Sequence, residues 1–95
     1  MSVRYSRMAD GSLAAWVSNE PSSFAEVCDI VVRQLGGQIR EELIDLDQSY
    51  VDVEVDGQLI TLHSEAFLGV CVLATTPETE ETVQRVAEYI DAGGS

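Results

Sequence analysis

The stretch that decides the fold is SYVDVEVDGQLITLHSE, residues 49–65. Apolar and polar residues alternate on both sides of Asp56-Gly57, a dipeptide typical of the two-residue loop of a β-hairpin. With these two residues as the loop, the register places three pairs on one face: Val55 with Gln58, Val53 with Ile60 and Val51 with Leu62. We expect this face to be buried, because a shift by one residue would expose all of these side chains.

The opposite face of the hairpin is polar and aromatic. The same register places three other pairs there: Glu54 with Leu59, Asp52 with Thr61 and Tyr50 with His63. Just upstream, Asp45 and Asp47 alternate with Ile44 and Leu46, as in a strand. We expect the acidic side of this strand to lie on the polar face of the hairpin. Seven acids and no base occupy residues 41–56. We predict a partner-binding surface made of eight residues: Tyr50, Asp52, Glu54, Leu59, Thr61, His63, Asp45 and Asp47.

The N-terminal segment predicts a second hairpin. Residues 2–8 and 12–19 are rich in strand-forming side chains, and Asp10-Gly11 between them is a turn signal. In the second of these strands Leu13, Ala15 and Val17 share one face, and Trp16 lies on the other. A single hairpin is only marginally stable, so we expect it to join a larger sheet.

Two amphipathic helices are predicted at residues 21–37 and 75–95. In the first, Ser23 and Glu26 fit a capping box, and Gly36-Gly37 ends the helix. In the second, Thr76 is the expected cap with Pro77 at the first helical position, and Gly93-Gly94 ends the helix. The expected core stripes are Phe24, Val27, Cys28, Val31 and Leu35 in the first helix, and Val83, Val86, Ala87 and Ile90 in the second.

The remaining segments read as further strands. Residues 38–43 fit either a strand or a helix, and the apolar run at residues 67–74 is typical of a central strand. Phe67 and Leu68, just before Gly69, are predicted to be core or rim residues. The sequence therefore predicts a single α+β domain over residues 1–95, with element order ββαββββα. Its mainly antiparallel sheet has five to six strands, with both helices packed on one face.

Composition sets the class of partner. Asp and Glu number 17 against five arginines and no lysine, which gives a net charge of −12. Such a surface repels nucleic acids and anionic membranes and attracts basic proteins, although acidic charge also serves solubility alone. There is no secretory signal and no apolar run long enough to span a membrane, so we expect a cytoplasmic protein. Cys28 and Cys71 lie in apolar surroundings and are predicted to be buried free thiols, with a disulfide as the alternative.

A catalytic or metal site would have to start from His63, the only histidine. With Asp52 and Glu54 on the same face it could act as a general base or a metal ligand. An exposed strand face lacks the concavity that excludes water, however, and the sequence carries no ligand-spaced motif, phosphate-binding loop or nucleophile motif. We therefore expect a protein that is not an enzyme and needs no cofactor.

The segments GSLAAWVS, FAEVCDIVVRQLGG and SYVDVEVDGQLITLHSEAFLGVCVLA together resemble two kinds of small bacterial protein. One is a family of unknown function; the other is the small acidic immunity proteins that neutralise polymorphic or contact-delivered toxins. The resemblance covers residues 11–75 and implies an inhibitor that binds a basic cognate toxin domain. It transfers no individual residue. The alternative is a homodimeric structural or adaptor domain, and the sequence leaves monomer or homodimer open.

Overall fold

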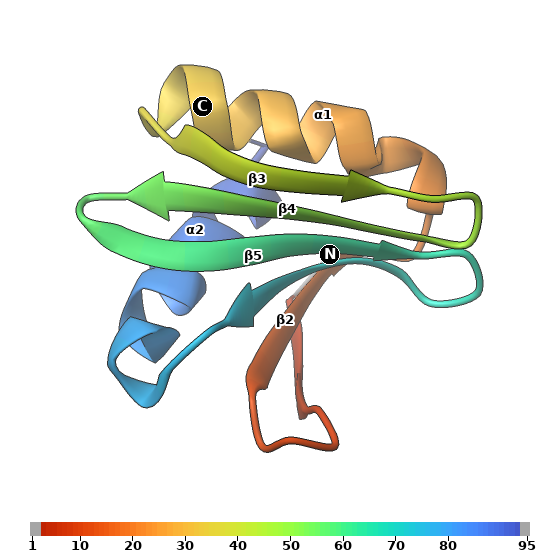
Figure 1. The fold of residues 1–95 in the computed structure, drawn as a ribbon, viewed down its shortest axis with the longest axis horizontal. Coiled ribbons are helices and arrows are strands. Elements are labelled where there is room, and N and C mark those ends of the chain that lie inside the picture. Colours follow the sequence, from red (N-terminus) through yellow and green to blue (C-terminus); the bar gives the residue numbers. More distant parts are fainter. Residues whose placement is uncertain (1–2, 94–95) are drawn as a thin grey trace.

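The computed structural model describes residues 3–93. Six strands form one antiparallel sheet in the order β1-β2-β6-β5-β4-β3 (Figure 1). The strands are β1 (Arg4–Arg7), β2 (Leu13–Ser18), β3 (Gln38–Ile44), β4 (Gln48–Val55), β5 (Gln58–Glu65) and β6 (Gly69–Ala74). The main helices are α1 (Phe24–Asp29) and α2 (Glu80–Asp91). The predicted α+β class and element order are confirmed, and the ambiguous residues 38–43 lie in a strand.

The central hairpin has the register expected from its sequence. Asp56 and Gly57 both adopt positive φ angles, of 52° and 77°, as a type I′ turn requires. Val53 then pairs with Ile60 and Val51 with Leu62, and all four side chains are buried. The alternation in the sequence therefore translates directly into one buried face and one face of different chemistry.

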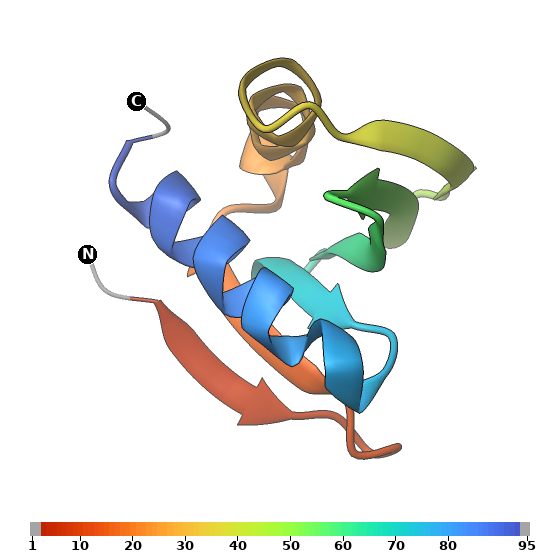
Figure 2. The same ribbon diagram turned by 90° about the vertical axis from the view of Figure 1, so that its left-hand side faces the viewer.

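Both helices lie on the same side of the sheet, as Figure 2 shows. They cover the valine face of the central hairpin, and one continuous core results from this packing. The core residues are Leu13, Ala15, Val17, Val27, Val31, Val51, Val53, Val55, Ile60, Leu62, Val70, Val72, Ala74, Val83, Val86 and Ala87. Phe24, Cys28, Leu35 and Ile90 are partly buried against it, so both predicted helical stripes face the core. No helix within residues 3–93 is long and apolar enough to cross a membrane.

The first helical segment differs from the prediction in its details. It opens with a 3₁₀ turn over Pro21–Ser23, continues as α1 and widens into a π-helical turn over Ile30–Gln34. The predicted capping box is wrong: the Ser23 hydroxyl donates to the carbonyl oxygen of Glu20 at 2.8 Å and does not cap α1. In this 3₁₀ turn the Ser23 backbone N–H also donates to the Glu20 carbonyl oxygen, so both donors of Ser23 bond to the preceding turn and not to α1.

The second helical segment begins at the predicted cap, Thr76, with Pro77 directly after it, and Thr79 completes a capping box with Thr76. Pro77–Thr79 forms a 3₁₀ turn, and the Thr79 hydroxyl donates to the Thr76 carbonyl oxygen at 2.7 Å. The same hydroxyl accepts the Thr76 backbone N–H at 3.2 Å. Thr76 is thus at the predicted boundary, while the Thr79 side chain closes the turn. Gly94, part of the predicted stop, lies outside the described residues.

The two cysteines lie on opposite sides of the sheet. Cys28 packs against the helix-side core and is half-buried, whereas Cys71 belongs to a separate cluster on the helix-free face. Both are free thiols. The disulfide alternative is incompatible with this fold, because the sheet separates the two sulfur atoms.

Candidate binding face

We call the sheet surface that the helices leave uncovered the open face; Figure 1 looks onto it. All six predicted hairpin residues lie on this side of β4 and β5, in the pairs Tyr50–His63, Asp52–Thr61 and Glu54–Leu59. Asp45 and Asp47 do not join them. They lie in the turn between β3 and β4, because β3 already ends at Ile44. The Asp47 carbonyl oxygen there accepts the Ala66 backbone N–H at 2.9 Å, which joins this turn to the β5–β6 turn.

His63 is buried, with only 2% of its surface exposed, and not partly exposed as expected from the sequence. Tyr50 covers it: the two rings stack with their centroids 4.3 Å apart and an angle of 16° between planes. Nδ1 of His63 lies 3.1 Å from the Ser49 carbonyl oxygen, and Nε2 lies 3.7 Å from Oε2 of Glu65. The imidazole is therefore a packed and hydrogen-bonded part of the sheet.

The carboxylates predicted near His63 are engaged elsewhere. Asp52 accepts the Thr61 hydroxyl at 2.8 Å, and Glu54 pairs with Arg40 at 2.9 Å. Among residues 3–93, no group of three His, Cys, Asp or Glu side chains is placed to hold a metal ion. The geometry gives His63 a packing role beneath Tyr50.

A small apolar cluster occupies the β2–β6 part of the open face. Ala14, Trp16 and Cys71 are buried there, with Met8 and Leu73 packed against them. The indole N–H of Trp16 donates to the Ser6 hydroxyl at 3.0 Å, and the Arg4 guanidinium lies 5.5 Å from the ring centroid. Trp16, considered a possible anchor for a partner, is thus held inside the protein. Burial, with the nearby Glu65 carboxylate adding to it, raises the pKa of Cys71 to about 12.

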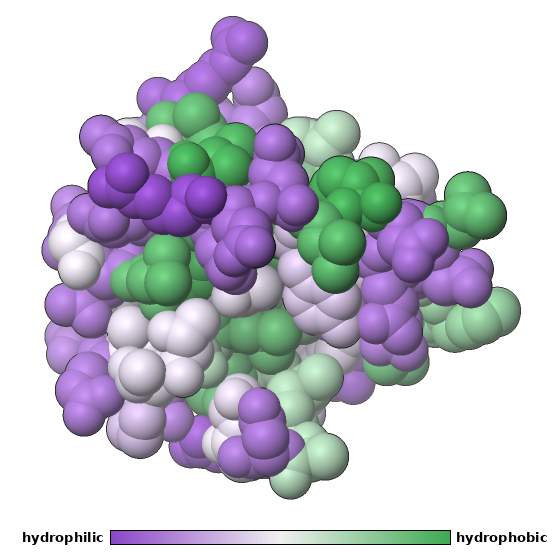
Figure 3. Space-filling view, in the orientation of Figure 1, coloured by the Kyte–Doolittle hydropathy of each residue, from purple (hydrophilic) through white to green (hydrophobic). Residues whose placement is uncertain are grey.

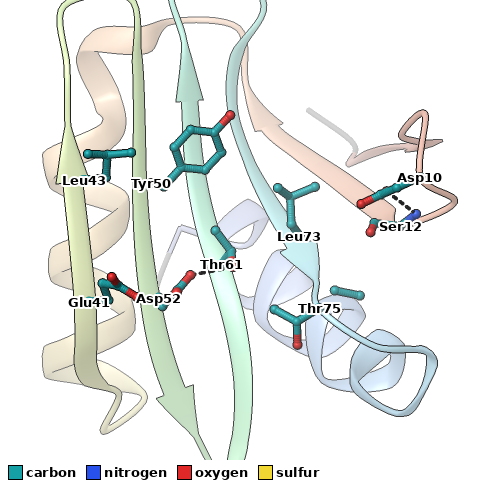
Figure 4. A pocket seen from close by; sticks show the side chains of 10 residues that line it. Asp10, Ser12, Glu41, Leu43, Tyr50, Asp52, Thr61, Leu73 and Thr75 are labelled. Carbon is teal, nitrogen blue, oxygen red and sulfur yellow. Dashed lines mark hydrogen bonds between the residues drawn. The ribbon is translucent and has the colours of Figure 1, made fainter.

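A hollow of about 440 Å³ opens on this face between β3–β4 and the β1–β2 loop (Figure 4). Its lining residues are Asp10, Ser12, Glu41, Leu43, Tyr50, Asp52, Thr61, Leu73, Ala74 and Thr75. The sequence predicted a strand face without concavity. The hollow exists because residues of the edge strand β3 and of the β1–β2 loop both border it, at opposite ends of the sheet. Three of the predicted binding residues, Tyr50, Asp52 and Thr61, line it.

The hollow is acidic, and the protein's own arginines do not neutralise it. Four arginines form ion pairs elsewhere: Arg7 with Glu80, Arg33 with Asp29, Arg40 with Glu54 and Arg85 with Asp56. Glu41 and Asp52 lie directly opposite each other on β3 and β4, and neither has an arginine partner within residues 3–93. Asp10 adds a third carboxylate, whose pKa is lowered by a hydrogen bond from the Ser12 backbone N–H.

Exposed apolar side chains gather where the β3–β4 and β5–β6 turns meet. We call this the apolar end; its residues are Leu43, Ile44, Leu46, Phe67 and Leu68. Leu46 is 97% exposed and Phe67 is 94% exposed. The placement of Phe67 in the core or rim was wrong, because Phe67 is at the tip of a turn that extends beyond the sheet. Figure 3 shows hydrophobic groups among hydrophilic ones toward the right-hand end, where these turns lie.

The sequence signal for the apolar end was available but easily misread. Leu43, Ile44 and Leu46 interrupt an acidic run, and Phe67-Leu68 follows Glu65 and Ala66 directly before a strand. Large apolar residues at such positions are more often buried than exposed. Only the three-dimensional pairing of the two turns reveals that nothing in the described chain covers these side chains.

Comparison of the chain with protein-family models, with curated proteins and with solved structures gave no match.

Proposed function

We propose that this protein is a non-enzymatic acidic binding protein of the cytoplasm, and specifically an immunity protein that binds and neutralises a cognate toxin. The observation that carries the proposal is the combination of an acidic open face, left unneutralised at Glu41 and Asp52, with the adjoining apolar end. Interfaces commonly pair charge, which steers association, with a few large apolar anchors that hold the complex.

The charge supports a basic partner. A net charge of −12 accelerates association with a basic surface, with association rates reaching ~10⁸ M⁻¹s⁻¹ at low salt. A basic toxin domain, such as a nuclease that binds phosphate, presents a surface of this kind. The resemblance of residues 11–75 to small immunity proteins favours the same class of partner.

The test uses the genomic neighbour of this chain. Where an adjacent, larger reading frame ends in a basic domain, that domain is expressed in cells with and without this protein. We expect growth only when both are present, and a complex that survives purification at moderate salt. A domain that remains toxic and forms no complex would overturn the proposal.

A charge reversal locates the binding surface in that complex. Asp52→Lys should weaken binding by roughly tenfold and flatten its dependence on salt. Glu81→Lys, an equal change of charge on exposed α2, is the matched control and should have a smaller effect. Equal affinities for the Asp52→Lys variant and the unchanged protein would place the partner on another face.

A second function, a homodimeric structural or adaptor domain, is favoured by one observation. β3 is an edge strand, and all seven of its residues are exposed, including Ile39, Leu43 and Ile44. Unpaired edges are templates for strand addition. Sedimentation equilibrium at low and high salt separates the two functions: a free monomer supports the immunity role, and a tight dimer at both salt concentrations supports the adaptor role.

A further inference from the structure

The acidic hollow contains two carboxylates that no arginine of the described residues neutralises. Glu41 and Asp52 are direct cross-strand neighbours on the open face. Like charges directly opposite each other destabilise a sheet. The nearest base in the sequence, Arg40, sits at a register shift between Ile39 and Glu41 and bonds Glu54 instead, at 2.9 and 3.1 Å. A cation supplied from outside would relieve this repulsion.

The walls of the hollow suit a long side chain with a flat charged head. Figure 4 shows Glu41 and Asp52 side by side on neighbouring strands, with Leu43 and Tyr50 above them and Leu73 across the hollow. One face of the Tyr50 ring covers His63, and Tyr50 also lines the hollow, where an occupant can contact it. Leu43 and Leu73 offer apolar contact to an aliphatic stem. Asp52 is held in place by the Thr61 hydroxyl, at 2.8 Å.

These features match arginine better than lysine. The guanidinium group is planar, forms two parallel hydrogen bonds with carboxylates and stacks on aromatic rings. Lysine carries a compact, strongly hydrated charge that gains less from a tyrosine ring and two neighbouring carboxylates. The volume of about 440 Å³ falls in the range of pockets that enclose small ligands, so one side chain enters without any rearrangement of the sheet.

We propose that the hollow on the open face receives one arginine side chain of the protein partner, with its guanidinium on Glu41 and Asp52 and against Tyr50. This inference rests on the proposed function and adds the residue type that the partner presents and the place where it binds. The remaining contacts, including the apolar end, then surround this central charged contact.

The test is a nuclear magnetic resonance titration of the isotope-labelled protein with N-acetyl-arginine methylamide and, separately, with the corresponding lysine derivative. We expect saturable shifts of the amide signals of Asp52, Thr61 and Leu73, and affinity for the lysine derivative at least threefold lower. Glu41→Gln should weaken arginine binding by roughly fivefold, as expected for the loss of one charge-assisted hydrogen bond.

Glu42→Gln is the matched control. Glu42 neighbours Glu41 on the same strand but pairs with Val51 of the buried face and does not line the hollow. The substitution removes the same charge as Glu41→Gln but from outside the hollow, so it should leave arginine binding nearly unchanged. Equal weakening by both variants, equal affinity for the two derivatives, or shifts spread evenly over the surface would overturn the arginine site.

The two proposals fail separately. If a toxin domain binds this chain but the arginine derivative does not bind the hollow, the immunity role is supported and the arginine site is rejected. Conversely, if the arginine derivative binds at Glu41 and Asp52 but this protein does not protect cells from the domain encoded by the adjacent reading frame, the arginine site is supported and the immunity role is rejected.

Discussion

Gly69 shows how a single residue fixes the junction between β2 and β6. Its φ angle is +112°, and a Cβ atom built there would lie 2.0 Å from the Ser18 carbonyl oxygen. The pairing of β2 with β6 shifts register at this point, between Trp16 and Ser18, which brings the two backbones close together. The atoms in the way belong to the backbone, so no side-chain rotation relieves the overlap.

We therefore expect Gly69→Ala to lower the free energy of unfolding by about 3 kcal/mol or more, through both the positive φ angle and the overlap. Urea denaturation followed by tryptophan fluorescence measures this, since Trp16 is buried close to the junction. Gly11→Ala is the matched control: Gly11 also has positive φ, +90°, but no atom within 4 Å of its Cβ position. It should lose only about 1–2 kcal/mol. Equal losses would mean that the overlap at Gly69 is relaxed in solution.

The two cysteines should differ in reactivity and contribute a pH dependence at alkaline pH. Burial raises the pKa of Cys71 to about 12 and that of Cys28 to about 11. At pH 8 we expect a thiol reagent to modify half-buried Cys28 first and Cys71 only on unfolding, because the thiolate is the reactive form. Mass spectrometry after timed alkylation measures the order; a native protein modified first at Cys71 would contradict it.

The same shifts fix the sign of the stability change. Between pH 9 and 12 the unfolded chain releases the Cys71 proton while the folded protein keeps it, so stability falls as the pH rises. The slope from Cys71 is about 1.4 kcal/mol per pH unit. Cys71→Ser at the same position would remove this slope, and an unchanged alkaline slope would contradict the assignment.

At this scale the sequence predicted side-chain direction better than burial. Asp56-Gly57 determined the register, and the alternation then assigned the six predicted pairs of β4 and β5, from Tyr50–His63 to Val55–Gln58, to the correct faces. The burial of His63 was missed because it depends on the stacked Tyr50 ring and on buried Cys71, the cross-strand neighbour of His63 on β6. Neither feature has a period along the chain.

Local sequence rules describe one of the two helix starts and fail at the other. A 3₁₀ turn precedes each α-helix; Thr76 caps its turn as expected, in a capping box with Thr79, whereas Ser23 does not cap α1. Pro21 and Pro77 open these turns, and the sequence signal for a cap does not distinguish a 3₁₀ start from an α-helical one.

Thr79→Ala should therefore destabilise the protein by about 1–2 kcal/mol, because it removes a buried hydroxyl that both donates to and accepts from Thr76. Thr79→Ser, which keeps the hydroxyl, should recover part of the loss. Ser23→Ala, at the other helical segment, should lose less than about 0.5 kcal/mol. Thermal or urea unfolding of the three variants decides; a Ser23→Ala loss as large as that of Thr79→Ala would restore the capping role predicted from sequence.

The sequence did not decide between strand and helix for residues 38–43, which lie in the edge strand β3. Its residues are exposed on both faces, so no buried side imposes a period of two on the sequence. The register shift at Arg40 breaks the alternation further. The apolar end was hidden for the same reason, since exposed turns impose no pattern that distinguishes a binding anchor from a core residue.

Across the whole molecule, the acidic charge that would favour binding to a cationic partner lowers the stability of the free protein. A net charge of −12 generally favours association with basic surfaces, but it destabilises the compact state through self-repulsion. The repulsion is most concentrated where carboxylates face each other across strands, at Glu41 and Asp52. A site shaped for a cationic partner should therefore be a place where the free protein gains stability when charge is removed.

Glu41→Gln should accordingly raise the free energy of unfolding of the free protein by about 0.3–0.5 kcal/mol at low salt, while weakening its binding to arginine. The gain should shrink in 0.5 M NaCl, because exposed charges are then screened within about 4–5 Å. Glu78→Gln, on the exposed first turn that leads into α2, removes one charge in the same way from a position where the helix dipole favours a carboxylate. It should leave stability unchanged or lower it. If both variants stabilise the protein equally, the effect belongs to the net charge as a whole. If only Glu41→Gln does so, the repulsion lies in the hollow. A cation bound there would then restore the free energy of unfolding that the free protein loses through this repulsion.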